Sequence, residues 1–321
     1  MGPDPAYNPR MKLGSLIRRG ALLLLVVAAL AQYWLMQRTQ DAAARLTARL
    51  IPHGELRYQR LWPFLWGGAR VWGLSFQPEG LFRVGLQAAP GFRVQVRELR
   101  VQHLRQGADG QLESLAGQAF GVRLPLADLH GIAAPGPAAL PMPSPSELGY
   151  AVIEFDLDFR VEYVDSAHLA LVDLSAAGAE LGRLTLDVRL EGSPVVFSRV
   201  PDQLLLRRLE LRWADGGLGQ RYREVAATRA RLSRGDWQRA LIARLNQRAR
   251  QENWKWDAAS AAAARRVIAD ADFLRLRLDP PGDAVIRNMR LYPMSDWPAL
   301  LGLELATEGR IERPPPRRTW P

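Results

Sequence analysis

Two aspartates at alternate positions form the closest approach in this chain to a carboxylate pair or a hard-metal site. Asp156 and Asp158 lie in an alternating segment, where side chains two residues apart point to the same face of a strand. The same face also carries Glu154, Arg160 and Glu162, and no third cluster of ligands is near in the sequence. We therefore favour a solvated strand face over a catalytic or metal site.

The only close grouping of an acid, a hydroxyl and an imidazole is Asp165, Ser166 and His168. Adjacency in sequence does not provide the geometry of nucleophile, base and orienting group, and a turn explains these residues better. The other histidines lack the spacing of a metal site: His53, His103 and His130. The chain has no cysteine, which excludes thiolate nucleophiles and cysteine-ligated metals. We therefore predict that the protein is not an enzyme and has no cofactor or bound metal, with a periplasmic hydrolase as the weakest alternative.

A basic block with helical periodicity, from about residue 217 to 271, is the most distinctive charged region. Between residues 219 and 270 it has 12 basic against 5 acidic residues, a net charge of +7 within the +10 of the whole chain. Ser233 is a plausible N-cap for one of its helices. Such a block suits an anionic membrane surface or a protein partner, although a solvated face in an arginine-rich chain is an equally simple explanation. The candidate binding residues are Arg239, Arg244, Arg248, Arg250, Trp237, Trp254 and Trp256.

Near the N-terminus, residues 20–36 form a run without charges that is close to the minimum length for a membrane-spanning helix. Arg18 and Arg19 before it, and Tyr33 and Trp34 at its far end, suit the two membrane interfaces. The run predicts a single-pass anchor in a bacterial inner membrane, with the N-terminus cytoplasmic and the body in the periplasm. The alternative is a signal peptide cleaved after Ala31.

The body of the chain alternates with the period of β-strands. The clearest segment is 153–163, where six apolar residues alternate with five charged ones, as in an antiparallel strand with one wet face. The apolar phase slips by one residue between Val71 and Leu74, and again between Val96 and Leu99, which indicates bulges or bends. The predicted fold class is α+β: a transmembrane helix, then a curved, mainly antiparallel sheet forming a groove or half-barrel, with a helical insertion.

Composition sets the expected boundaries along the chain. They are a cytoplasmic basic N-terminus (1–19), the anchor (20–36), a membrane-proximal helix (37–52), an N-terminal β-part (53–132), a proline-rich linker (133–147), a second β-part (148–312) with its helical insertion (217–271), and an extended basic tail (313–321).

Three segments follow one another near the start of the body: Gly54-Glu55-Leu56-Arg57-Tyr58, Pro63-Phe64-Leu65-Trp66-Gly67 and Val71-Trp72-Gly73-Leu74-Ser75-Phe76. The last has the form V-x-x-L-x-F, and a similar form returns at Val96-Arg97-Glu98-Leu99-Arg100-Val101. This pattern resembles the opening of AsmA-like envelope proteins. The resemblance implies an open, groove-like sheet associated with lipid transfer or envelope maintenance. The chain is short for that family, and the helical block has no obvious place in it.

The expected function is non-catalytic: a periplasmic protein that binds or transfers lipid and helps to maintain the envelope. Its expected partners are a phospholipid membrane, a bound lipid and other envelope proteins, whereas nucleic acid is disfavoured. The alternative is an interaction scaffold of an envelope assembly or secretion complex, which would use the basic helices and the tail as docking surfaces.

Overall fold

The structure is a computed structural model of the 321-residue chain. It describes residues 32, 36–37, 39–41, 43–44, 47–48, 53–64, 68–85, 88–106, 112–129, 143–193, 203–293 and 295–308.

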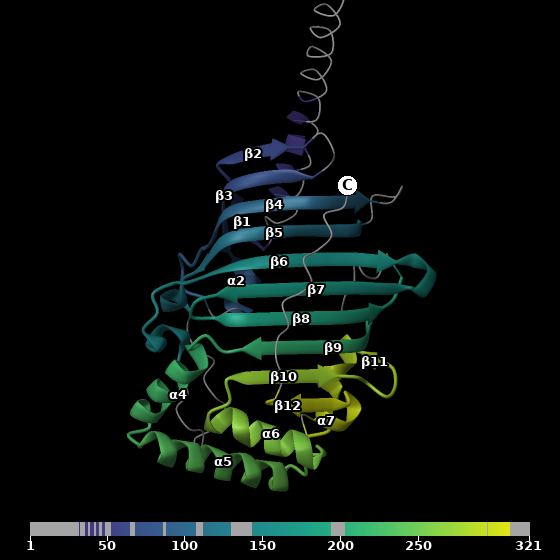
Figure 1. The fold of residues 1–321 in the computed structure, drawn as a ribbon. Coiled ribbons are helices and arrows are strands. Elements are labelled where there is room, and N and C mark those ends of the chain that lie inside the picture. The colour runs from purple at the N-terminus through teal and green to yellow at the C-terminus, as the bar shows by residue number, and fades with distance from the viewer. Residues whose placement is uncertain are drawn as a thin grey trace, which may run out of the picture.

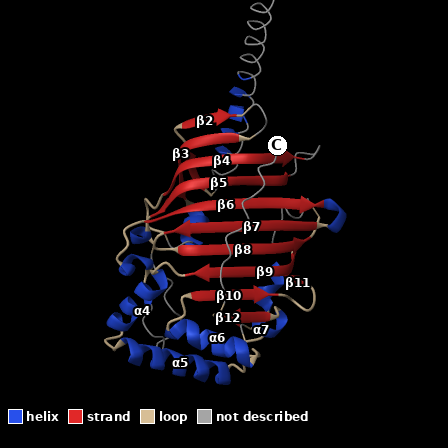
Figure 2. Ribbon diagram, in the orientation of Figure 1, coloured by secondary structure: helices blue, strands red, loops and turns tan. Residues whose placement is uncertain are grey.

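One open antiparallel sheet dominates the molecule (Figures 1 and 2). Its strands are β1 (Gly54–Arg57), β2 (Arg60–Pro63), β3 (Ala69–Pro78), β4 (Val94–Gln106), β5 (Leu112–Leu124), β6 (Ile153–Val164), β7 (Leu169–Gly178), β8 (Gly182–Glu191), β9 (Leu205–Ala214), β10 (Phe273–Leu278), β11 (Ala284–Val285) and β12 (Leu303–Ala306). The spatial order is β1-β3-β4-β5-β6-β7-β8-β9-β10-β12, with β2 paired to β3 and β11 to β9. Because β5 pairs directly with β6, the two expected β-parts belong to one sheet.

The phase slip expected in β3 coincides with a glycine, and a second glycine in β5 lies beside the slip expected in β4. Gly73 in β3 and Gly121 in β5 have φ values of 61° and 59°, which favour glycine because it lacks a Cβ atom. The register of β4 with its neighbours places Arg97 between these two glycines. The left-handed conformation of Gly73 shifts the alternation of side chains along β3 by one residue. Val71 and Leu74, on either side of it, therefore lie on the same face of the sheet.

Helices connect the strands or lie at the edges of the sheet. They are α2 (Gly80–Gly85), α4 (Leu218–Arg229), α5 (Arg234–Gln251), α6 (Ala258–Ala269) and α7 (Trp297–Leu300), with 3-10 turns η1 (Leu126–Asp128), η2 (Pro145–Leu148), η3 (Asp165–Ala167) and η5 (Ile286–Leu291). Helices α4, α5 and α6 follow one another between β9 and β10 and gather beside the β10–β12 end of the sheet (Figure 1).

Polar side chains cap the N-termini of these three helices, and one of them, Asp215, directly follows the strand β9. The Ser233 hydroxyl accepts the Asp236 N–H at 3.1 Å at the start of α5, and Asp257 accepts the Ser260 N–H at 2.8 Å at the start of α6. The Asp215 carboxylate accepts the N–H groups of Gly219 and Gln220, at 2.9 and 3.1 Å, in the first turn of α4. Each contact satisfies backbone donors that the helix itself leaves free.

The buried apolar residues form four small clusters. One joins β2 and β3, a second spans β3 to β6, a third lies where α4 meets one end of β5 and β6, and a fourth joins α4 to α5. In the described part of the chain, none of these clusters includes a buried residue of β8, β9 or β10.

The expected N-terminal anchor requires correction. Among the described residues, no helix is both long enough and apolar enough to cross a membrane. We therefore do not retain the transmembrane helix, the single-pass topology or the inner-membrane localisation that depended on it. Arg18, Arg19, Tyr33 and Trp34 lie outside the described residues, as do Ala31 and nearly all of 20–36.

Other expected segments are described only in part. The described residues between 32 and 48 are helical, and Gln32 donates a hydrogen bond to the Pro63 carbonyl at 3.1 Å. Of the linker 133–147, residues 143–147 are described, and a capping box of Ser144 and Glu147 begins η2 there. The tail 313–321 lies outside the described residues.

Candidate functional site

One face of the sheet is apolar from β6 to β10. Alternation selects every second residue of each strand, except at a register shift in β9 between Leu206 and Leu209. The cross-strand register brings these residues to the same side. This apolar face consists of Phe155, Leu157, Phe159, Val161, Tyr163, Ala170, Val172, Leu174, Ala176, Leu184, Leu186, Val188, Leu190, Leu206, Leu209, Leu211, Trp213, Leu274, Leu276 and Leu278.

Most of the apolar face is only partly buried. Ala170 and Ala176 are its two buried members, whereas the larger side chains are partly exposed. In the described part of the chain, β6, β7 and β8 pack mainly against their neighbouring strands. About 20 side chains, at roughly 32 Å² of sheet each, make an apolar area on the order of 600 Å². A contiguous apolar face that is partly exposed is a candidate interaction site.

Helix α4 covers one end of this side of the sheet. Its residues Leu218, Tyr222 and Val225 pack against a cluster that contains Ile153 and Phe155. Burial raises the pKa of the Tyr222 phenol. The helix thus closes one end of the apolar face. At its centre, around Leu186, the described strands have their main contacts with neighbouring strands.

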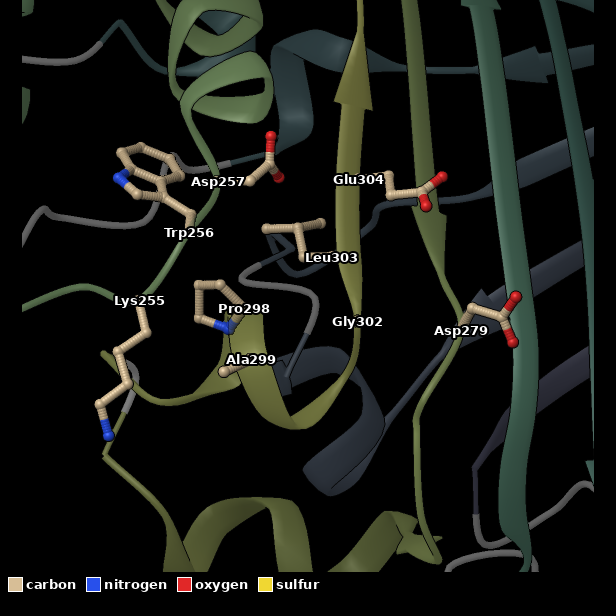
Figure 3. A pocket seen from close by; sticks show the side chains of 9 residues that line it. All are labelled: Lys255, Trp256, Asp257, Asp279, Pro298, Ala299, Gly302, Leu303 and Glu304. Carbon is tan, nitrogen blue, oxygen red and sulfur yellow. The ribbon is translucent and has the colours of Figure 1, made fainter.

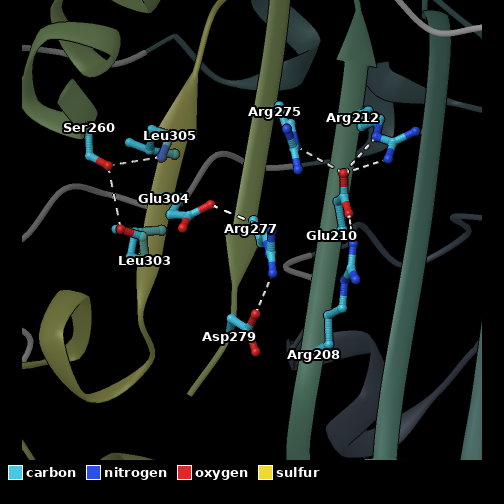
Figure 4. Close-up of polar contacts among 10 residues, drawn as sticks. All are labelled: Arg208, Glu210, Arg212, Ser260, Arg275, Arg277, Asp279, Leu303, Glu304 and Leu305. Carbon is cyan, nitrogen blue, oxygen red and sulfur yellow. Dashed lines mark hydrogen bonds and ion pairs between the residues drawn. The ribbon is translucent and has the colours of Figure 1, made fainter. Parts of the chain in front are cut away.

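The opposite face of the same strands is charged, and its centre is a buried carboxylate (Figure 4). Glu210 of β9 is 3% exposed and forms ion pairs with Arg208, Arg212 and Arg275, the last two at 2.6 and 2.9 Å. Arg277 beside it pairs with Asp279. These contacts come from three alternating residues of β9 and from β10, so the sheet register builds the cluster.

The arginines determine the ionisation of Glu210. Burial by itself raises the pKa of this carboxyl, but hydrogen bonds from Arg208 and Arg212 and the charges of Arg212 and Arg275 outweigh it and lower the pKa to about 2. A similar centre lies on β4, where a hydrogen bond from Arg70 lowers the pKa of Glu98. Both carboxylates are satisfied by cations of the sheet, which favours a structural role for them.

A shallow hollow of about 400 Å³ lies between the start of α6, α7 and β12 (Figure 3). Its charged lining groups already have partners. Lys255 pairs with Asp296 at 3.1 Å, Asp257 caps α6, and Asp279 and Glu304 both face Arg277. The hollow therefore offers no group prepared for acid, base or nucleophilic chemistry.

The predicted basic surface residues all belong to helix α5. Arg239, Arg244, Arg248 and Arg250 are exposed. Arg239 pairs with Asp236 at 2.6 Å, and Arg248 with Glu252 at 2.7 Å. Exposed ion pairs of this kind contribute little to stability, so these side chains can exchange partners readily.

The three predicted tryptophans have different surroundings. Trp254 and Trp256 are partly exposed and meet edge to face, with ring centroids 5.1 Å apart. Trp237, in contrast, is 1% exposed and packs against Ala226 and Ala227 of α4. Its expected contact with a surface partner is therefore corrected, because this side chain holds α5 against α4.

The groups considered for catalysis lie in ordinary structural positions. Asp156 accepts the Gly121 N–H and Asp158 accepts the Gln118 side-chain amide, each at 2.7 Å. His168 follows η3 with a φ of 51°, and its Nδ1 lies 3.3 Å from the Tyr163 hydroxyl. Among the described residues, no three histidine or acidic side chains are grouped as metal ligands would be.

Comparison with protein-family models gives no match, and comparison with curated proteins gives no significant match. The resemblance to AsmA-like proteins therefore stays a prediction.

Two charged residues of structural importance were not predicted from the sequence. Glu210 was detectable, since it lies between two arginines in a strand, as Arg208-x-Glu210-x-Arg212. Arg223 of α4 is 6% exposed, and its Nε has no hydrogen-bond partner. A weak signal existed for it too, because it shares a helix face with Ala226, Ala227 and Ala230.

Proposed function

We propose that this protein is a non-catalytic lipid-binding protein, and that the apolar face holds the hydrocarbon chain of an anionic amphiphile. The observation that supports the proposal is the apolar face itself, continuous over five strands and only partly buried. The charged face of the sheet can remain in contact with water. Covering the apolar face with hydrocarbon is favourable because it removes apolar surface from water.

The energetics suit a hydrocarbon chain. Each methylene group buried on the sheet contributes up to about 0.8 kcal/mol, so a chain of twelve carbons offers on the order of 10 kcal/mol before the entropic costs of binding. Leu184, Leu186 and Val188 of β8, flanked by their register partners on β7 and β9, provide an unbroken apolar track at the centre.

Charge favours an anionic amphiphile over a second copy of the chain. The protein carries a net charge of +10, and +7 of it lies between residues 219 and 270, the helices beside the apolar face. Two copies would bring like charges together, which opposes association, whereas an anionic head group is attracted.

Dodecyl phosphate, titrated into the full chain below its micelle concentration by calorimetry, tests the proposal. We expect saturable binding that Leu186→Glu weakens by at least about tenfold, because a carboxylate is placed within the hydrocarbon track. Thr185→Glu is the matched control, since residue 185 is adjacent on β8 but lies on the charged face, opposite Arg212. Equal binding by all three proteins, or no binding by any, would refute the proposal.

A second candidate function is a scaffold that docks an acidic protein on α5. The exposed side chains of Arg239, Arg244 and Arg248 along this helix favour it. Under this hypothesis, a protein partner co-purifies with the chain and is lost when these three residues are changed to Glu. Dodecyl phosphate binding then stays within about threefold of the native value, because the apolar face is untouched.

A further inference from the structure

Large apolar side chains are exposed along the segment that leads from η5 into α7. Leu291 is 73% exposed, more than any other large apolar side chain in the described part of the chain, and Tyr292 beside it is 48% exposed. Leu300 at the end of α7 is 37% exposed. The Trp297 indole N–H donates to the Tyr292 carbonyl at 3.3 Å and joins this segment to α7. Exposed apolar side chains grouped in one short segment indicate a contact surface.

A second segment with aromatic side chains adjoins this one. Trp254 and Trp256, which are partly exposed and meet edge to face, lie between α5 and α6. Lys255 between them donates its backbone N–H to the Ser295 carbonyl at 3.3 Å, and its ammonium group pairs with Asp296 at 3.1 Å. These two contacts hold the two segments together.

Residues 254–256 and the described residues of 291–300, called the aromatic end below, lie at the end of the sheet opposite α4. Helix α4 follows the last residue of β9, whereas β11 pairs with Leu205 and Leu206 at the beginning of that strand and leads into η5. Figure 1 shows α4 and α7 at opposite ends of the strands. Because Leu206 belongs to the apolar face, the aromatic end lies beside the end of that face that α4 does not close.

The residue types of the aromatic end suit the surface of a bilayer. Tryptophan and tyrosine favour the head-group level, where the ring is in apolar surroundings while the N–H or O–H group stays hydrated, and leucine gains by entering the hydrocarbon. The charge has the sign that attracts anionic lipid. The stretches 248–257 and 286–300 contain five basic and three acidic residues, a net charge of +2 within the +10 of the chain.

We propose that the aromatic end docks on a bilayer that contains anionic phospholipid, with Leu291 in the acyl region and the tryptophans at the level of the head groups. Docking of this kind needs no membrane-spanning helix. The inference goes beyond the proposed function and does not depend on it. If both hold, the bilayer lies next to the open end of the apolar face, where an amphiphile can pass between the two.

A dye placed at one residue of the full chain tests the inference. The sequence has no cysteine, so a single substitution creates the only labelling site. Leu291→Cys and Trp254→Cys, each labelled with a nitrobenzoxadiazole dye, report on the two segments of the aromatic end. Leu232→Cys is the matched control, because this leucine is also exposed, at 39%, but lies between α4 and α5. The readout is local because the apolar run 20–36 also favours adsorption to vesicles.

The expected result is a signal confined to the aromatic end. With vesicles of phosphatidylglycerol and phosphatidylcholine in equal amounts, emission at positions 291 and 254 should shift to the blue and rise at least about twofold, because the dye leaves water. Lipids brominated in their acyl chains should quench the emission at 291. Vesicles of phosphatidylcholine alone should need at least about fivefold more lipid for the same signal, since they lack the attraction for basic residues. The label at 232 should not respond.

Three outcomes would overturn the docking surface: no response at position 291, equal responses at 291 and 232, or equal responses to the two kinds of vesicle. A response at 232 alone would place the bilayer at the α4 end and would also overturn it. Dodecyl phosphate is titrated into the same labelled proteins. If they respond to vesicles but do not bind dodecyl phosphate, the proposed function fails and the docking surface stands.

Discussion

Removing the charge of Glu210 should destabilise the protein more than any other single change on the charged face. The carboxylate is 3% exposed and pairs with Arg208, Arg212 and Arg275, so Glu210→Gln leaves three cations close together without their anion. The pKa of about 2, against an ordinary value of 4.5, corresponds to about 3 kcal/mol of stability from the ionised form. We expect Glu210→Gln to lower the free energy of unfolding by about that amount at pH 7.

The contribution of Glu210 to stability should depend on pH. The pKa of Glu210 is depressed in the folded state, so its contribution is complete above the unfolded value near 4.5 and is lost as the pH falls toward 2. The stability difference between the native protein and Glu210→Gln should therefore be largest at neutral pH and shrink between pH 5 and pH 2.

Urea unfolding followed by circular dichroism measures both quantities, provided that the transition is two-state. Glu304→Gln is the matched control, because the side chain of Glu304 is 64% exposed and lies 3.9 Å from its arginine, so its loss should cost less than about 0.5 kcal/mol. A Glu210→Gln variant as stable as this control, or a difference that does not change with pH, would refute the reasoning.

Two further substitutions test the account of the helices. Trp237→Ala should cost about 3–5 kcal/mol in urea unfolding because the ring is buried between α4 and α5, whereas Trp254→Ala should cost less than about 1 kcal/mol; similar losses would contradict the packing described. Ser260→Ala should cost about 1–3 kcal/mol, because the buried hydroxyl accepts the Leu305 N–H at 3.0 Å and joins α6 to β12; a melting temperature equal to that of the native chain would show that this contact is not needed.

Much of the sheet could be predicted from local pattern alone. The alternation over 153–163 predicted the strand β6, which spans Ile153–Val164, because a strand with one wet face repeats every two residues. The phase slip after Val71 predicted an irregularity at the place where Gly73 of β3 adopts a left-handed backbone conformation. The helical block also lies where its periodicity and the Ser233 cap indicated.

The site was harder to predict because it depends on tertiary placement. Trp237 was grouped with surface residues although its spacing to Leu241 and Leu245 puts it on the apolar side of α5, and the structure shows that this spacing was the better guide. Arg223 is charged, and only the alanines on its own helix face separate it from the eleven other basic residues between 219 and 270. Its burial follows from the packing of α4 against both Trp213 and α5, which the periodicity of one helix does not encode.

The most direct test of the central claim is to locate the bound hydrocarbon chain. An alkyl phosphate carrying a diazirine in its chain would be photolysed with the full protein, with and without excess dodecyl phosphate, and the labelled residues mapped by peptide mass spectrometry. We predict labelling that dodecyl phosphate suppresses and that falls on the apolar face of β6 to β10, around Leu186. Labelling confined to α5, or labelling that dodecyl phosphate does not suppress, would contradict this prediction.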